Sequence, residues 1–293
     1  AEWDRNIVEY NGCINLLKGA IVCADRVSTV SERYAEEILT EYYGSGLHHI
    51  LRANRDKLCG ITNGIDTHYY NAAIDPEIAA NFTPDDLTGK AKCKEDLETT
   101  CGFTHEPETP IVAMVSRLAA HKGFDLVRRV LEETLRETEM RFVLLGTGEF
   151  ELEDYFSELV ARYPERVCVR LEYNKSLSKK FYAGADMFLM PSKSEPCGLA
   201  QMIASRYGTV PIVRETGGLY DTIHAYNKYT GMGNGFSFTN YNAHEMKNVI
   251  EIAMKMYREE KPEWEHLVKS VMNVDFSWRV SAKKYIALYE KMQ

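Results

Sequence analysis

The sequence has 293 residues, of which 45% are hydrophobic and 27% are charged, and its net charge is −8. This length is typical of about two domains, and the composition fits a soluble globular protein with a sizeable core. The acidic balance argues against a general nucleic-acid-binding protein, because neutralising phosphates needs clustered cations. No apolar run approaches the roughly 20 residues that span a bilayer, and the polar start Ala1–Arg5 does not resemble a signal peptide. We therefore expect a cytoplasmic protein without nucleic-acid or membrane partners.

Cysteine and histidine spacing gives no sign of a metal site. The seven cysteines form no Cys-x-x-Cys pair, and an odd number argues against a complete disulfide frame. The eight histidines do not form a group with the spacing of metal ligands. The sequence predicts reduced thiols, no metal ion and no cofactor.

The first 57 residues differ from the rest of the chain. They contain a predicted helical stretch (Tyr10–Cys23), a short strand (Arg26–Val30) and a helix that Ser31 is suited to cap. This segment is too short to close a domain of its own, so we interpret it as the last part of a larger domain. A polar stretch with two prolines, Tyr69–Thr88, follows and is predicted to be an irregular connection.

The middle of the chain alternates short apolar runs with amphipathic helical patterns. The predicted strands are Ile111–Val115, Phe142–Leu145, Val167–Leu171, Met187–Met190 and Thr209–Val213. Buried strands that alternate with helices indicate a parallel sheet with right-handed crossovers. The sequence thus predicts an α/β, Rossmann-like doubly wound domain over residues 58–272. Residues 273–293 are predicted to end in a helix, about Ser281–Lys291.

Ligands of open parallel sheets bind beyond the carboxyl ends of the strands, so the residues after each predicted strand are candidate site residues. Arg117 and Lys122 follow the first strand, and fixed cations there would stabilise a departing diphosphate. Solvated surface charges are the alternative. Tyr173 follows the third strand and could stack on a base, although packing is a strong alternative among 18 tyrosines.

The last two strand ends carry a carboxylate and a glycine pair. Glu195 precedes Pro196 at an expected helix start, where it could accept hydrogen bonds from sugar hydroxyls or merely serve the helix end. Gly217 and Gly218 would let free N–H groups approach a phosphate, or form an ordinary tight turn. Together the strand ends suit a nucleotide diphosphate that carries a sugar. Neither the dinucleotide fingerprint nor a Walker A motif is present.

With these residues assembled, the chain resembles bacterial glycogen synthase and plant starch synthase through nearly its whole length. The most specific segments are Glu195-Pro196-Cys197-Gly198-Leu199 and Thr216-Gly217-Gly218-Leu219. Further matching segments are Leu17–Ile21, Thr29–Ser31, Asn63–Asp66, Ser116–Leu118 with Lys122-Gly123, and Phe276–Trp278. The resemblance implies the GT-B fold, of which residues 58–272 would be the C-terminal half and residues 1–57 a remnant of the N-terminal domain.

The resemblance also implies a role for each site residue. Arg117 and Lys122 would act on the ADP diphosphate, and Glu195 would face the transferred glucose. The glucose pocket would be lined by Cys197, Gly198 and Leu199, and the phosphate and sugar loop would be Thr216, Gly217 and Gly218. Tyr173 would stack on adenine. Two positions depart from the family's usual sequence. Glu172 stands where Gly is common, and His121 replaces a frequent Gln.

The implied activity is metal-free transfer of glucose from ADP-glucose to the non-reducing end of an α-1,4-glucan, with retention of configuration. The family's N-terminal domain, with its Lys-x-Gly-Gly-Leu motif, is expected to be missing apart from residues 1–57. The chain by itself is therefore expected to bind the donor without elongating glucan, and to self-associate through the surface left open. The alternatives are a non-catalytic nucleotide-sugar or glucan-binding module, and a GT-B transferase that uses another donor such as UDP-glucose.

Overall fold

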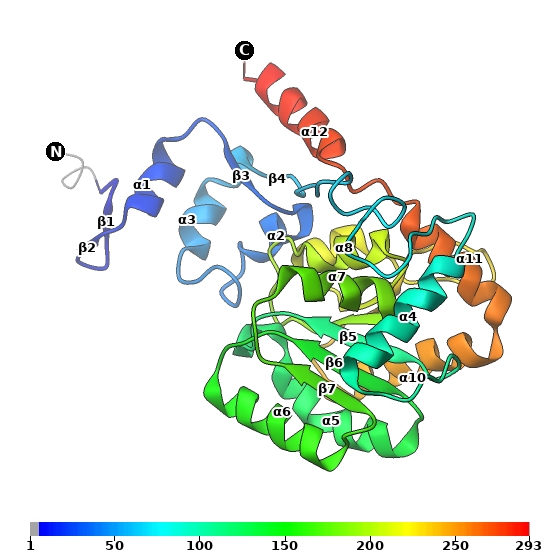
Figure 1. The fold of residues 1–293 in the computed structure, drawn as a ribbon. Coiled ribbons are helices and arrows are strands. Elements are labelled where there is room, and N and C mark those ends of the chain that lie inside the picture. The colour runs from blue at the N-terminus through cyan, green and yellow to red at the C-terminus, as the bar shows by residue number, and fades with distance from the viewer. Residues whose placement is uncertain (1–5, 293) are drawn as a thin grey trace.

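A parallel sheet forms the centre of the computed structural model, which describes residues 6–292 (Figure 1). Its strand order is β10-β9-β8-β5-β6-β7, and every neighbouring pair is parallel. The strands are β5 (Ile111–Val115), β6 (Arg141–Leu145), β7 (Val167–Arg170), β8 (Met187–Met190), β9 (Val210–Arg214) and β10 (Phe236–Phe238). The first five lie within one or two residues of the predicted strands, while β10 was not predicted. The doubly wound α/β fold is confirmed.

Helices cover both faces of this sheet. The helices are α4 (Thr88–Cys101), α5 (Phe124–Glu137), α6 (Phe150–Arg162), α7 (Lys175–Gly184), α8 (Ala200–Arg206), α9 (Gly217–Thr222), α10 (Ala243–Glu259) and α11 (Lys261–Met272). On one face α4 contacts α7, and α8 contacts both α7 and α11. On the other face α5 contacts α10, and Phe124 of α5 packs edge-on against Phe156 of α6. Because both faces are covered, the central strands are apolar throughout and buried.

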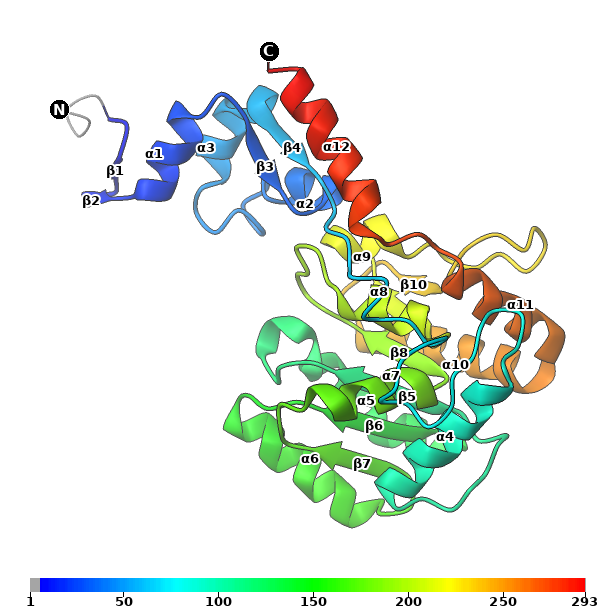
Figure 2. The same ribbon diagram turned by 45° about the horizontal axis from the view of Figure 1, so that its top comes forward.

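The N-terminal part is a smaller group of elements (Figure 2). It comprises β1 (Glu9–Tyr10), β2 (Cys13–Ile14), α1 (Leu16–Cys23), β3 (Val27–Thr29), α2 (Glu32–Glu37), α3 (His48–Ala53), the 3₁₀ turn Arg55–Lys57 and β4 (Leu58–Gly60). Ile21, Leu47 and Leu51 form its small core. The β4 strand pairs in parallel with β3, so it belongs structurally to this part although it follows residue 57.

The predicted helix over Tyr10–Cys23 is wrong in its first half. Residues 9–14 form a two-residue hairpin, because Asn11 and Gly12 adopt the positive φ angles of 52° and 77° that such turns require. Asn15 then caps α1 by accepting a hydrogen bond from the Lys18 amide. The prediction for the next helix is confirmed, since Ser31 caps α2 through the Tyr34 amide at 2.8 Å.

Two chain crossings connect the N-terminal part to the large α/β unit, and they lie side by side. The Ile65 amide donates to the Phe276 carbonyl at 2.8 Å, and the Ser281 hydroxyl donates to the Thr62 carbonyl at 2.6 Å. A Cβ on Gly64 would lie 2.4 Å from the Trp278 nitrogen, so only glycine permits this close approach. The final helix, α12 (Trp278–Glu290), then runs beside the N-terminal part, where Lys284 pairs with Glu32 at 2.7 Å (Figure 2).

The irregular connection predicted before α4 is confirmed, and a buried ion pair fixes it to the sheet unit. Asp75 accepts hydrogen bonds from Lys179 of α7 and from the Tyr207 hydroxyl. Both Asp75 and Lys179 are buried. A buried charge is tolerated when it is paired and hydrogen-bonded in this way. The connection is therefore held in place although it has no regular structure.

Candidate functional site

The candidate site lies where the strand order reverses. β5 and β8 are neighbours, but the chain continues from them toward opposite edges of the sheet, which opens a crevice at their carboxyl ends. The two exit loops are joined there by a hydrogen bond from the Lys193 amide to the His121 carbonyl, at 2.9 Å. Gly123 has a φ of 80°, and a Cβ on it would lie 2.1 Å from the Pro191 carbonyl oxygen. Glycine at this position therefore lets the loops pack backbone to backbone.

Lys122 and Glu195 meet across this junction. The Lys122 Nζ lies 2.7 Å from Oε2 of Glu195, and the Ser192 hydroxyl donates to the same oxygen at 2.9 Å. The Lys122 side chain is 19% exposed and that of Glu195 is 9% exposed, so the pair is largely sheltered from water. The sequence predicted both residues for the site, but it did not predict that they pair with each other.

Arg117 reaches the same region from the end of β5 and has no such partner. Its side chain is exposed and takes part in none of the hydrogen bonds or ion pairs found within residues 6–292. It lines a pocket of about 290 Å³ together with Tyr173, whose side chain is 84% exposed. An unpaired guanidinium beside an exposed aromatic ring can bind a phosphate and a base side by side.

Two tyrosines of this pocket were not among the candidates. Tyr70 comes from the irregular connection and Tyr182 from the buried side of α7, and both line the pocket. Burial is the main cause that raises the pKa of Tyr70, and it raises the pKa of Tyr182 beyond the range of ordinary tyrosines. Both hydroxyls therefore stay protonated and neutral. The sequence contains many tyrosines, and no spacing pattern distinguishes these two from the others. Sequence reasoning therefore could not identify them.

His121 is influenced by both cations of the site. Partial burial, followed by the charges of Lys122 and Arg117, holds the pKa of His121 below its usual value of 6.5. The imidazole is therefore neutral at pH 7. Arg117 and Lys122 are both near enough to His121 to lower its pKa.

The segment from Glu195 to Leu199 is not a helix start, contrary to the prediction. The α8 helix begins at Ala200, because Gly198 adopts a left-handed φ of 69° that interrupts any earlier turn. The side-chain amide of Gln201 donates to the Cys197 and Gly198 carbonyls at 3.2 and 3.0 Å. Cys197 is buried, and that burial raises the pKa of its thiol. Leu199 is half-exposed.

The predicted phosphate loop, Thr216 to Gly218, has no free amide in this structure. The Gly217 N–H donates to the carboxylate of Glu37, at 3.1 Å to each oxygen. The Gly218 N–H donates to the Glu195 carbonyl at 3.0 Å, and the Thr216 N–H donates to the Arg214 carbonyl at 2.9 Å. The turn itself is formed as predicted, but its N–H groups hold protein oxygens.

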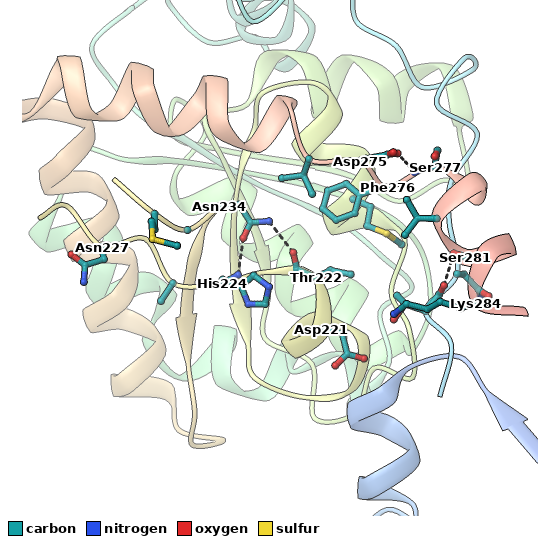
Figure 3. A pocket seen from close by; sticks show the side chains of 18 of the residues that line it. Asp221, Thr222, His224, Asn227, Asn234, Asp275, Phe276, Ser277, Ser281 and Lys284 are labelled. Carbon is teal, nitrogen blue, oxygen red and sulfur yellow. Dashed lines mark hydrogen bonds between the residues drawn. The ribbon is translucent and has the colours of Figure 1, made fainter. Parts of the chain in front are cut away.

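A larger pocket among the described residues lies elsewhere. It has a volume of about 720 Å³ and is formed by the two chain crossings, the end of α9 and the loop that follows it. Figure 3 shows its polar side chains, among them Asp221, His224 and Lys284. None of the predicted site residues lines it. The strand-end site is the better candidate, because Arg117 and Tyr173 share a pocket there and the Lys122–Glu195 pair lies at the same edge of the sheet.

Two features are absent from residues 6–292. No group of three or more His, Cys, Asp and Glu side chains is arranged to hold a metal ion. No helix in this range is long and apolar enough to cross a membrane.

Comparisons with known proteins assign the family. The family model described as "Glycosyl transferases group 1" matches residues 102–266, which include most of the sheet and the exit loops of the site. The chain belongs to the group 1 glycosyltransferases. A second model, described as "Starch synthase catalytic domain", matches residues 1–53. The glycosyltransferase family therefore agrees with the fold and with the resemblance seen in the sequence.

Within this family, the chain is similar to glycogen synthases and starch synthases. The chain is 48% identical to a glycogen synthase of Geobacillus thermodenitrificans over 97% of its own length and 58% of the relative's. It superposes on the catalytic domain of starch synthase IV from Arabidopsis thaliana, bound to ADP and acarbose, with a TM-score of 0.89 and 38% identity. That match covers 95% of this chain and 58% of the Arabidopsis chain. The chain thus spans a little over half the length of these relatives.

A more distant structure shows the fold alone. The Anabaena protein HepE in complex with UDP and glucose has a TM-score of 0.62 and 18% identity, with 92% of this chain and 64% of that chain covered.

Proposed function

We propose that the strand-end site binds ADP-glucose and that this chain supplies the donor side of a retaining glucosyltransferase that extends α-1,4-glucans. The observation that carries the proposal is that Arg117 and Tyr173 share one pocket beyond the carboxyl ends of the strands, with the Lys122–Glu195 pair at the same edge of the sheet. The likeness to starch synthase IV, which was solved with ADP and acarbose, supports the choice of nucleotide and of an α-glucan acceptor.

The contacts of the site support a role for each residue. Tyr173 would stack on adenine, with the pocket of about 290 Å³ enclosing the nucleoside. Arg117 and Lys122 would hold the diphosphate, for which Lys122 exchanges its contact with Glu195 for one with phosphate. Glu195 would then be free to accept hydrogen bonds from glucose hydroxyls. Cys197, Gly198 and Leu199 follow it in the chain and would line the glucose pocket.

The loop of Thr216, Gly217 and Gly218 would support the sugar and phosphate from behind. The Gly217 and Gly218 amides already donate to Glu37 and to the Glu195 carbonyl. In this conformation the loop can therefore pack against the ligand but offers it no N–H donor. Direct contact with phosphate would need the turn to release one of these bonds.

Transfer breaks the bond between the glucose anomeric carbon and the diphosphate oxygen and forms a bond from that carbon to an acceptor hydroxyl. The diphosphate gains negative charge as it leaves, so cations fixed beside it lower the barrier. In a retaining reaction the acceptor attacks from the face that ADP leaves, and the acceptor proton can pass to the departing phosphate. We propose no metal or cofactor for this chemistry.

There are two alternatives. The likeness to HepE, solved with UDP and glucose, shows that this fold also occurs in a protein bound to a uridine nucleotide. A binding module without activity is the other alternative. We predict that the 293-residue chain binds its donor but does not elongate glucan, since orienting the acceptor can be worth roughly 7–11 kcal/mol of barrier.

The test is a pair of measurements on the purified chain. Calorimetric titration with ADP-glucose and UDP-glucose is expected to show tighter binding of ADP-glucose, and the reverse order would contradict the donor. Incorporation of labelled glucose into glycogen is expected to be absent, and clear elongation would show that this chain can orient the acceptor by itself. Self-association through the exposed apolar side chains of α1 and α12 and a cytosolic location also remain predictions.

A further inference from the structure

The α2 and α9 helices cap each other. The Glu37 carboxylate, at the end of α2, accepts the Gly217 amide at 3.1 Å and the Thr216 hydroxyl at 3.1 and 3.2 Å. In return the Asp221 carboxylate of α9 accepts the Ser31 hydroxyl at 2.6 Å and the Arg33 amide at 3.2 Å. Figure 3 shows Asp221 beside the end of the blue helix α2. Acidic groups are stabilising at helix N-termini, so the arrangement favours contact between the two helices.

Glu37 is the more deeply buried carboxylate of the two and needs this position. Only 6% of its residue surface is exposed, and it pairs with Arg33, whose Nε lies 3.4 Å away and whose side chain is 41% exposed. A buried carboxylate is costly without hydrogen bonds to its oxygens. The turn at Thr216 and Gly217 provides them, so Glu37 and the turn fix each other.

The same turn rests directly on Glu195. Gly217 has a φ of 44°, and a Cβ on it would lie 2.1 Å from the Glu195 carbonyl oxygen. The Gly218 amide donates to that carbonyl at 3.0 Å and to the Pro196 carbonyl at 3.2 Å. A movement of the turn therefore moves the backbone of the residue that pairs with Lys122.

We propose that Glu37 is a positioning residue for the donor site, acting through the 216–218 turn on Glu195 and thereby on Lys122. This inference rests on the proposed function for its meaning in catalysis, but the positional coupling stands on the contacts alone. The route runs from the Glu37 carboxylate to the Gly217 amide, from the Gly218 amide to the Glu195 backbone, and from the Glu195 carboxylate to Lys122. It links the N-terminal part of the chain to the cation that would hold diphosphate.

A second set of contacts connects the N-terminal part to the same loop by another route. The Tyr43 hydroxyl lies 3.3 Å from Nη2 of Arg214, and Nη1 of Arg214 donates to the Lys193 carbonyl at 2.9 Å. Lys193 belongs to the loop that carries Ser192 and Glu195. Two segments of the N-terminal part thus bear on one loop of the site.

The first test follows the backbone and needs no ligand. Amide hydrogen exchange of the full chain is compared for the parent, Glu37→Ala and Glu36→Ala. Glu36 is the matched control, because it pairs with the same Arg33 at 3.3 Å but is exposed and does not reach the turn. We expect Glu37→Ala to speed exchange over residues 195–199 as well as at the turn, with β5 and β6 unaffected. Unchanged exchange over 195–199 would overturn the proposal.

The second test measures ligand binding. Glu37→Ala is expected to weaken ADP binding by about threefold to about thirtyfold, while adenosine binding and the Glu36→Ala control stay near the parent. Glu37→Gln, which keeps one acceptor oxygen, is expected to lie between the parent and the alanine variant. Equal losses for ADP and adenosine, or a glutamine variant no better than alanine, would contradict positioning through the turn. A parent that binds no ADP would refute the proposed function, and the exchange experiment would still decide the coupling.

Discussion

The Lys122 ammonium and the Glu195 carboxylate form a sheltered ion pair, 2.7 Å apart, at the junction of the β5 and β8 exit loops. Without ligand each group neutralises the other, and Ser192 fixes the shared carboxylate oxygen. Binding a diphosphate would replace Glu195 as the partner of Lys122. In the free state, therefore, the Arg117 side chain is open to solvent, whereas Lys122 remains paired with Glu195.

The ion pair predicts a difference in stability between the two cation variants. Lys122→Ala leaves the Glu195 carboxylate largely buried without its partner, which should lower the free energy of unfolding by about 1–3 kcal/mol. Arg117→Ala changes an exposed, unpaired side chain and should stay within about 0.5 kcal/mol of the parent. Urea denaturation measures both. Adding Glu195→Gln to Lys122→Ala should restore part of the loss, and a double variant as unstable as the single one would argue against the pair.

Glu195→Ala should separate sugar recognition from diphosphate binding. If Glu195 accepts bonds from glucose hydroxyls, the variant loses affinity for ADP-glucose. Its affinity for ADP should stay the same or rise, because Lys122 is then no longer neutralised. Calorimetry with both ligands on this variant and on the isosteric Glu195→Gln provides the comparison. An equal loss for ADP and ADP-glucose would assign Glu195 a structural or phosphate-side role.

Tyr173→Ala should weaken adenosine and ADP alike, by the roughly 1–3 kcal/mol typical of one base–aromatic stack. Tyr173→Phe keeps the ring and should bind both ligands like the parent. Because the Tyr173 side chain is almost wholly exposed, neither variant should change the unfolding free energy by more than about 0.5 kcal/mol. Full adenosine affinity in the alanine variant would place the base elsewhere.

His121 predicts a pH dependence of ADP binding. Its pKa lies below 6.5 in the free protein because of burial and the neighbouring cations, and a bound diphosphate would raise it. A ligand that raises a pKa binds more tightly as pH falls from the bound-state value toward the free-state value, and the gain levels off below it, so the histidine should favour ADP at acidic pH. Since ADP itself titrates, the parent is compared with His121→Gln between pH 5.5 and 8. Identical pH profiles would show that the diphosphate does not approach His121.

Much of the fold follows from the sequence because the central strands are buried on both faces. Each such strand is a continuous apolar run, and Ile111–Val115 and Met187–Met190 match the predicted bounds without change. The hairpin at Asn11-Gly12 was missed because the apolar residues of 10–23 also fit a helical period. Its turn dipeptide was the signal that could have identified it.

Residues of the site can be predicted from the sequence only where a charged or aromatic side chain comes shortly after a predicted strand. Arg117, Lys122 and Tyr173 do so, and Arg117 shares a pocket with Tyr173. Glu37 and Tyr70 do not, because one lies in a helix 180 residues before its partner Gly217 and the other in an irregular connection. Nothing in the local sequence sets Glu37 apart from its exposed neighbour Glu36. Only the packing of α2 on α9 buries one and leaves the other in water.

The central claim is that the β5–β8 crevice holds the diphosphate of a nucleotide through Arg117 and Lys122. The most direct measurement is calorimetric titration of the parent, Arg117→Ala and Lys122→Ala with ADP and with adenosine. We expect the parent to bind ADP more tightly than adenosine, and each variant to lose about 1.5–3 kcal/mol for ADP while keeping its affinity for adenosine. Variants that bind ADP as tightly as the parent would show that the diphosphate lies elsewhere and would contradict the account.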